Sequence, residues 1–290
     1  MTSHSSGIGA KIGAYVELLK TRLSLLVAIS AVFGYAIAAD GAAAWTQMLW
    51  VGLGGMMITG ASNVLNQISE RDLDKLMKRT QNRPLPTGRL TVRESLVYAL
   101  VLAIAGVTML GYFFNLPAAL LGIIGLLSYA FVYTPLKKIS GISVFVGAFP
   151  GALPPLIGWV AYTGTLGLEG LLLFMFQFMW QFPHFWAIAW IADEDYKRAG
   201  FKMLPSAGGK SKYTAGLILA YTLCLAPMAF FPWEADMIGG WGVLGLVLAA
   251  LAFAWPAFRL YRTLDDRYAR KLMFSSFWYL PLIQILFMVA

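Results

Sequence analysis

The amino-acid sequence predicts an all-α, polytopic membrane protein with nine transmembrane helices. The chain is 59% hydrophobic and only 12% charged, whereas ordinary soluble domains are about 45–50% apolar. Apolar stretches of about 20 residues, the length that crosses a bilayer, recur along it. Cations fall on alternate connections between these stretches, as in membrane proteins. Together these observations exclude a soluble globular fold.

The predicted spans follow one another from near the N-terminus to the last residue. They cover residues 23–39, 48–69, 95–114, 117–135, 143–162, 168–190, 213–232, 238–258 and 272–290. Because little of the chain lies outside them, we expect residues 1–290 to form a single integral-membrane domain. The start of the chain is polar, and residues 1–12 are expected to form a flexible cytoplasmic tail.

The charges predict the orientation in the membrane. When nine spans are threaded, all 22 Lys and Arg residues fall on one side, in the N-terminal segment and in loops 70–94, 136–142, 191–212 and 259–271. The opposite loops hold Asp40, Glu169, Glu234 and Asp236 and no cation. The positive-inside rule places the N-terminus in the cytoplasm and the C-terminus across the cell (inner) membrane. The +8 net charge is then a topology signal, and no nucleic-acid partner is expected.

The first span has an alternative interpretation as a cleaved signal peptide. Lys20 and Arg22 precede an apolar run that ends in small residues before Asp40, a pattern typical of cleavage sites. We favour a retained helix, because both cations also form an ordinary cytoplasmic flank.

An acidic motif ends the second predicted span. Asn66, Glu70 and Asp74 are spaced i, i+4 and i+8, so on a helix they share one face. A second acidic cluster, Asp193-Glu194-Asp195, follows the sixth span on the same side of the membrane. Oxygen ligands beside cations suit Mg²⁺, which is often held by one or two carboxylates and substrate phosphates.

The motifs therefore predict a metal-dependent diphosphate site near the cytoplasmic face. The candidate metal-binding and catalytic residues are Asn66, Glu70, Asp74, Asp193 and Asp195. The candidate diphosphate-binding cations are Lys78, Arg79, Arg83, Lys137, Lys138, Lys197 and Lys202. The alternative is interfacial salt bridging, which we favour for Asp72 and for Asp265-Asp266. The helical spacing of Asn66, Glu70 and Asp74 favours function for that motif.

Aromatic residues favour an apolar substrate. The stretch 174–190 holds eight aromatic residues besides His184, and aromatic faces stabilise cations such as an allylic carbocation. Ordinary packing accounts for most membrane aromatics, and a lone His in a span is often structural.

The segment NQISERDLDKLMKRTQNRPLPTGR resembles the first Asp-rich motif of the UbiA superfamily of intramembrane prenyltransferases. In that motif an Asn is followed by acids four and eight residues on, then by Arg-Thr and Arg-Pro-Leu. The matching residues here are Asn66, Glu70, Asp74, Arg79-Thr80 and Arg83-Pro84-Leu85. The resemblance implies a helical bundle around a central cavity.

Three further stretches are similar to the protoheme IX farnesyltransferase (heme O synthase) branch of the superfamily. They are YTPLKK (133–138), VGAFPGALPPLIGW (146–159) and QFPHFWAIAW (181–190), which runs on to DYKRAGFKMLP (195–205). The resemblance covers about residues 20–290. It implies a Mg²⁺-dependent transfer of a farnesyl group from farnesyl diphosphate to a vinyl group of heme B, giving heme O. Tyr133, His184, Trp186 and Tyr196 are then candidates for the acceptor pocket.

Two positions depart from the pattern. Glu70 stands where Asp is usual, and Ser143 where Asn is usual. The expected partners are farnesyl diphosphate, heme B and the lipid bilayer, with a heme A-forming enzyme or oxidase assembly factors as candidates. Alternatives are prenylation of a quinone precursor or another tetrapyrrole, and a membrane transporter. Transporter sites lie near the midplane, whereas these ionisable groups gather at one membrane face.

Overall fold

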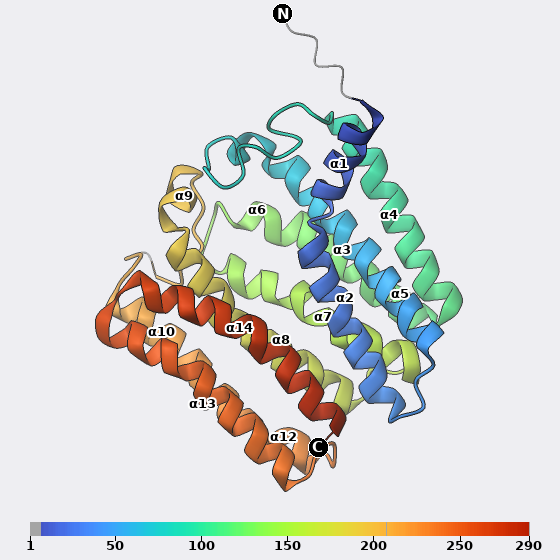
Figure 1. Cartoon of the computed structure of the whole chain (residues 1–290), viewed down its shortest axis with the longest axis vertical. Coiled ribbons are helices and arrows are strands. Elements are labelled where there is room, and N and C mark those ends of the chain that lie inside the picture. The colour runs from blue at the N-terminus through green and yellow to red at the C-terminus, as the bar shows by residue number, and fades with distance from the viewer. Residues whose placement is uncertain (1–6, 207, 290) are drawn as a thin grey trace, which may run out of the picture.

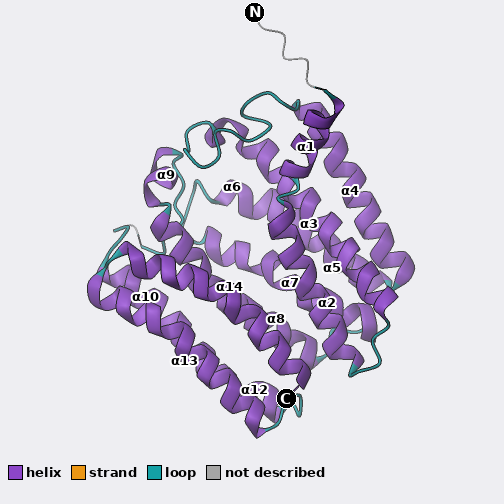
Figure 2. Cartoon of the chain, in the orientation of Figure 1, coloured by secondary structure: helices purple, strands orange, loops and turns teal. Residues whose placement is uncertain are grey.

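A computed structural model describes residues 7–206 and 208–289, and helices run through nearly all of this part of the chain (Figures 1 and 2). Nine of its segments are long and apolar enough to cross a membrane, which confirms the predicted all-α class. The spans are α2 (Thr21–Ala39), α3 (Trp45–Asp74), α4 (Val92–Phe113), α5–α6 (Leu116–Leu136), α7 (Ser143–Thr163), α8 (Leu168–Ile191), α10–α12 (Lys212–Glu234), α13 (Gly240–Thr263) and α14 (Asp266–Val289). Two helices too short to span are α1 (Ile8–Leu18) and α9 (Asp193–Arg198).

Close backbone approach joins α2 to α7 at the centre of the bundle. A Cβ atom on Gly158 would lie 1.9 Å from the carbonyl oxygen of Ala31, and one on Gly34 would lie 2.0 Å from that of Pro155. Small residues allow this approach between membrane helices, where dispersion contacts drive association. The first span is therefore part of the packed bundle.

Buried glutamines of α8 hold it against α7. Pro155 has no N–H, so the carbonyl of Gly151 loses its regular helical donor. The side-chain amide of Gln177 donates to that carbonyl at 2.8 Å, and Gln181 donates to the carbonyl of Ala148 at 2.9 Å. These bonds fix the relative position of α7 and α8 in an environment where an unpaired carbonyl is costly.

Helix α1 differs from the flexible tail predicted over residues 1–12. Residues 1–6 lie outside the described part, and residues 8–12 form the first turns of α1. Lys11 pairs with Glu94 at 2.5 Å, and Arg89 pairs with Glu17 at 2.8 Å. These ion pairs hold α1 across the end of α3 and α4, at the charged end of the molecule.

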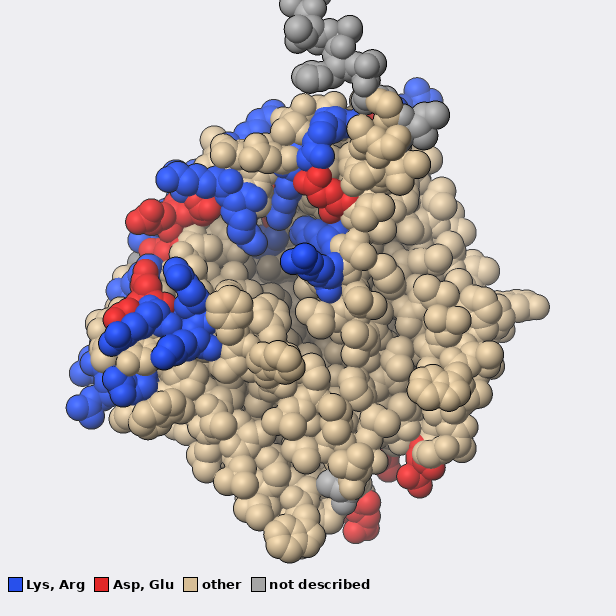
Figure 3. Space-filling model, in the orientation of Figure 1, with Lys and Arg blue, Asp and Glu red and all other residues tan. Residues whose placement is uncertain are grey.

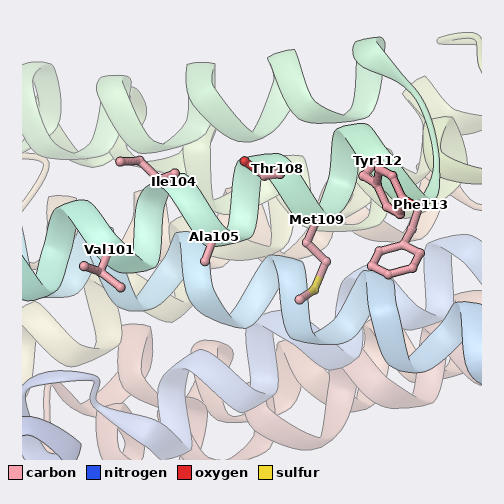
Figure 4. A pocket seen from close by; sticks show the side chains of 7 residues that line it. All are labelled: Val101, Ile104, Ala105, Thr108, Met109, Tyr112 and Phe113. Atoms are coloured by element: carbon pink, nitrogen blue, oxygen red, sulfur yellow. The ribbon is translucent and has the colours of Figure 1, made fainter.

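The surface separates into a charged end and an apolar belt. Lys and Arg side chains gather at one end around a hollow, and the few charged side chains visible at the opposite end are acidic (Figure 3). A shallow depression on α4 is lined by Val101, Ile104, Ala105, Thr108, Met109, Tyr112 and Phe113 (Figure 4). Because one helix supplies this whole lining and none of it is charged, we assign it to the lipid-facing belt.

Candidate active site

The last turns of α3 carry the first acidic motif into the protein interior. Asn66, Glu70 and Asp74 are 2%, 5% and 0% exposed, and their spacing puts them on one face of the helix. Buried ionised groups must be paired, because removing a charge from water is costly. Both carboxylates are paired with cations here, and Asn66 forms a hydrogen bond.

Two buried ion pairs connect this face to other segments. Lys137 Nζ lies 2.8 Å from Glu70 Oε1, although 67 residues separate them. Arg83 Nη1 lies 2.9 Å from both carboxylate oxygens of Asp74. The hydroxyl of Thr80 donates to the carbonyl of Asp74 at 2.9 Å and so anchors the loop that carries Arg83. Of the predicted diphosphate cations, Lys137 and Arg83 therefore lie against the acids.

A π-helical turn, η1 (Ser128–Tyr133), brings Lys137 to the site. Pro135 lacks the N–H that would continue a regular helix, and π-turns often mark functional sites. The hydroxyl of Thr134 donates to the carbonyl of Tyr129 at 2.9 Å and accepts from Asn66 Nδ2 at 3.1 Å. With its amide N–H thus engaged, the Asn66 side chain keeps its carbonyl oxygen for another ligand.

Lys137 is held as a cation. Its Nζ lies 4.6 Å from the ring centroid of Tyr133, within the range of a cation–π interaction. Burial is the largest single effect and lowers the pKa of Lys137, but Glu70, together with Tyr129 and Tyr196, raises the pKa above its ordinary value. The positive charge therefore persists beside Glu70 across the physiological pH range.

The second acidic cluster is paired within its own short helix. Asp193 Oδ2 lies 2.7 Å from Lys197 Nζ, and Asp195 pairs with Arg198. Across residues 7–206 and 208–289, no three His, Cys, Asp or Glu side chains lie close enough together to hold a metal ion. The structure therefore does not bring the two acidic clusters into one ligand set.

The segment after α9 nevertheless joins the first site. The backbone N–H of Lys202 donates to the carbonyl of Lys137 at 2.8 Å. Ser143, the position that departs from the family pattern, is fully buried and donates to Met203 Sδ at 3.8 Å. Tyr196 lies close enough to Lys137 to act on its charge. The loop after α9 and the loop before α7 thus form one wall of the first site.

The remaining predicted cations lie at the surface. Lys78, Arg79, Lys138 and Lys202 are exposed, and none of them pairs with an acid in the part of the chain that the structure describes. Lys197 is the exposed partner of Asp193. Asp72 pairs with Arg71 and Lys75 at the surface, which agrees with its interpretation as an interfacial salt bridge.

Lys20 joins the site although its sequence position indicated only a cytoplasmic flank. It lies between α1 and α2 with a left-handed backbone (φ 48°, ψ 55°). Gln67 and Asn63, both buried on α3, donate to the carbonyls of Leu18 and Leu19 at 2.8 and 3.3 Å. The amide side chains of α3 thus fix the break between α1 and α2 that carries Lys20.

The electrostatic surroundings of Lys20 place it among the site charges. Burial and the charges of Arg83 and Lys137 lower the pKa of Lys20 to about 7, against a smaller opposing effect of Glu70 and Asp74. The only features of the sequence that point to this position of Lys20 are the amide residues Asn63 and Gln67. Their partners are backbone groups, which cannot be identified from residue types.

The aromatic candidates occupy three different surroundings. Tyr133 and Tyr196 lie beside Lys137, whereas Trp186 packs with Phe182 and Tyr221 between α8 and α10, with ring centroids 5.4 and 5.0 Å apart. His184, 8% exposed, faces α14, where its Nδ1 lies 2.6 Å from Ser276 Oγ. The acceptor role predicted for all four residues stays a prediction.

The chemistry of the donor atoms fits Mg²⁺. Asn66 offers an amide carbonyl, and Glu70 and Asp74 offer carboxylate oxygens on the same buried face. Mg²⁺ commonly takes one or two carboxylates and completes its shell with water and substrate phosphates. The two carboxylates are neutralised by Lys137 and Arg83, so a metal would have to replace these partners.

The fold and this acid–cation site define an intramembrane protein with a charged site at the end of a helical bundle. The sequence model of the UbiA prenyltransferase family matches residues 27–280, and the chain belongs to that family. Protoheme IX farnesyltransferase from Cytophaga hutchinsonii is 45% identical over 282 residues, covering 97% of this chain and 99% of that protein. The protein of the same name from Flavobacterium psychrophilum is 42% identical, covering 95% and 93%.

Solved structures have the same fold. A structure of digeranylgeranylglyceryl phosphate synthase superposes with a TM-score of 0.79 at 19% identity, covering 96% of this chain and 98% of that one. A UbiA homologue from Archaeoglobus fulgidus, bound to DMAPP and Mg²⁺, gives a TM-score of 0.73 at 15% identity, covering 95% and 99%. These likenesses establish the UbiA-like fold for the described residues, which include nine candidate membrane helices.

Proposed function

We propose that this chain transfers a farnesyl group from farnesyl diphosphate to a vinyl group of heme B. The C–O bond to diphosphate breaks, a C–C bond forms at the vinyl group, and water adds as a hydroxyl and releases its proton. The products are heme O and diphosphate. The observation that carries the donor half is the buried pairing of Glu70 with Lys137 and of Asp74 with Arg83. The acceptor half rests on relatives named protoheme IX farnesyltransferase, one of them 45% identical over 97% of the chain.

The buried ion pairs suggest how the site accepts its donor. Lys137 and Arg83 neutralise Glu70 and Asp74, and removing one partner of a buried pair is strongly unfavourable. We propose that Glu70 and Asp74 would hold the metal, which would supply positive charge to the diphosphate. Lys137 and Arg83 would then be available to bind the diphosphate oxygens.

The same cations then act on the leaving group. Arg83 and Lys137, joined by Lys20 beside them, offset the negative charge that develops on the diphosphate as the C–O bond breaks. Mg²⁺, when bound, adds positive charge at the same oxygens. Exposed Lys78, Arg79, Lys138 and Lys202 are placed to attract the anionic donor toward the site from water.

We propose an orientation with the N-terminus and the site on the cytoplasmic side of the cell membrane and the C-terminus on the other side. The asymmetry of the cations, which gather at the end of the molecule that carries α1 and the acid–cation site (Figure 3), supports it through the positive-inside rule. Residues 1–290 would form one integral-membrane domain.

The test is a reaction of the purified chain in lipid nanodiscs with heme B, farnesyl diphosphate and Mg²⁺. We expect heme O by liquid chromatography and mass spectrometry, and loss of product when EDTA removes the metal. A parallel reaction offers a quinone precursor, 4-hydroxybenzoate, in place of heme B. Prenylated benzoate without any heme O would overturn the proposed acceptor.

A further inference from the structure

A polar contact lies between α8 and α14 in otherwise aromatic surroundings. His184 Nδ1 lies 2.6 Å from Ser276 Oγ, and that hydroxyl lies 2.5 Å from the carbonyl oxygen of Met273. Ser276 is fully buried and His184 is 8% exposed. Polar atoms at this depth are costly unless they are paired, so the direction of each hydrogen bond matters.

Counting protons determines the state of the imidazole. A serine hydroxyl carries one proton, and the carbonyl of Met273 can only accept, so the Ser276 proton goes to that carbonyl. Ser276 Oγ must then accept from His184, which requires the proton on Nδ1. The opposite ring nitrogen, Nε2, is left with a free lone pair in the neutral imidazole.

Nε2 makes no hydrogen bond within residues 7–206 and 208–289, and the protein does not enclose it completely. The ring is held in place because Trp180 stacks on it at 4.8 Å, and Phe277 meets it edge-on at 5.2 Å. Trp180 itself donates to the carbonyl of Ser276 at 3.1 Å.

We propose that His184 Nε2 binds the iron of the acceptor heme and that Ser276 is the positioning residue that fixes its tautomer and direction. A ring held by an Nδ1–H hydrogen bond with Nε2 bare is the usual arrangement of a metal-binding histidine. The proposal rests on the proposed function for the identity of the acceptor. It assigns to α14 a part in orienting the macrocycle so that a vinyl group faces the donor.

Binding of heme without farnesyl diphosphate tests this separately from turnover. Ferric and ferrous heme B are titrated into the chain in nanodiscs, with resonance Raman and EPR spectra as the readout. We expect an iron–histidine stretching band in the wild type, its loss in His184→Ala, and recovery of a nitrogen ligand when imidazole is added. Ser276→Ala should weaken heme binding about 10-fold, the usual effect of removing a group that orients a metal ligand, and Ser276→Thr should restore it.

Metal-free protoporphyrin IX separates iron binding from pocket shape. His184→Ala should leave its affinity unchanged while lowering that of heme B. The matched control is Ser95→Ala, which removes another fully buried serine hydroxyl from α4, one that makes no hydrogen bond within the described residues. It should leave the heme spectrum as in the wild type. Equal losses for both porphyrins, or a wild-type spectrum in His184→Ala, would overturn the assignment. A wild type that shows the iron–histidine band but makes no heme O would instead refute the proposed function.

Discussion

The two acidic motifs have similar composition but different physical surroundings. Glu70 and Asp74 are buried on a long membrane helix and pair with cations from other segments. Asp193 and Asp195 lie on the short helix α9 and pair with cations three or four residues away, whose side chains are 44–66% exposed. The first motif therefore depends on the tertiary fold, whereas the second forms its pairs locally.

The two motifs therefore differ in how much their ion pairs contribute to stability and in how easily their carboxylates can turn to a ligand. Removing one partner of a buried pair lowers the stability of the folded protein by about 3–5 kcal/mol, because a charge is left unpaired in low dielectric. An i,i+4 pair on a helix surface is worth only about 0.3–0.5 kcal/mol. We infer that the first motif is preorganised around its charges, and that the second is free to turn its carboxylates toward a ligand.

The largest effect is expected at Asp74. Asp74→Asn removes the charge that pairs with Arg83 and one candidate metal ligand, so heme O formation should fall by at least about 100-fold, the usual loss when a charge-stabilising group is removed. Stability should fall by up to about 3–5 kcal/mol, reduced by the partial exposure of Arg83. Thermal unfolding in detergent gives the stability, and mass spectrometry gives the turnover. Wild-type turnover in a folded Asp74→Asn protein would refute the metal role.

Neighbouring lysines provide the next test. Lys137 is buried against Glu70, and Lys138 is exposed. Lys137→Ala should lower turnover about 100-fold and destabilise the protein, because the Glu70 carboxylate is left buried and unpaired. Lys138→Ala serves as the matched control, and its effect should stay within about twofold, as for a surface charge that only steers the donor. Equal effects of the two substitutions would show that burial does not decide which lysine serves the site.

The second motif should give the reverse pattern of effects on stability and turnover. Asp193→Asn and Asp195→Asn each remove a local ion pair, so the free energy of unfolding should change by less than about 1 kcal/mol. If these carboxylates hold Mg²⁺ with the donor, turnover falls at low Mg²⁺ concentration and recovers partly at high concentration. The measurement is heme O formation across a magnesium titration. Unchanged magnesium dependence in both variants would remove the second motif from the metal site.

The sequence predicted the membrane helices because hydropathy is a sum over about 20 residues and tolerates local errors. It also predicted the buried face of α3, since Asn66, Glu70 and Asp74 follow helical spacing. It did not predict the partners of these acids. Lys137 reaches Glu70 across 67 residues through a π-turn, and nothing in the local pattern distinguishes it from the exposed Lys138.

Helix α1 was missed for a related reason. Its sequence lacks a membrane-length apolar run, and ion pairs with Glu94 and Arg89 hold it in place. The break after it puts Lys20, a residue without glycine's freedom, in a left-handed conformation. Such a conformation costs about 1–3 kcal/mol and persists where surrounding contacts impose it. Here the contacts are the amide hydrogen bonds from Asn63 and Gln67.

The smallest expected effect, and the one that tests whether Lys20 belongs to the first motif, is a pH dependence. Burial and the charges of Arg83 and Lys137 lower the pKa of Lys20 to about 7, so above that pH the free protein holds this lysine mostly neutral. Diphosphate favours the protonated form and raises the pKa, so donor binding at pH 8 should take up a proton. Apparent donor affinity should therefore decrease as pH rises above about 7.

Isothermal titration calorimetry measures this proton uptake directly. Binding of farnesyl diphosphate with Mg²⁺ at pH 8, in two buffers of different ionisation enthalpy, gives the number of protons taken up. Lys20→Arg keeps a permanent charge in the same place, so proton uptake by this variant should fall below that of the wild type. Comparing the two proteins cancels the protons that the diphosphate itself takes up. Equal uptake by both proteins would place Lys20 outside the donor site and leave Lys137 and Arg83 as its buried cations.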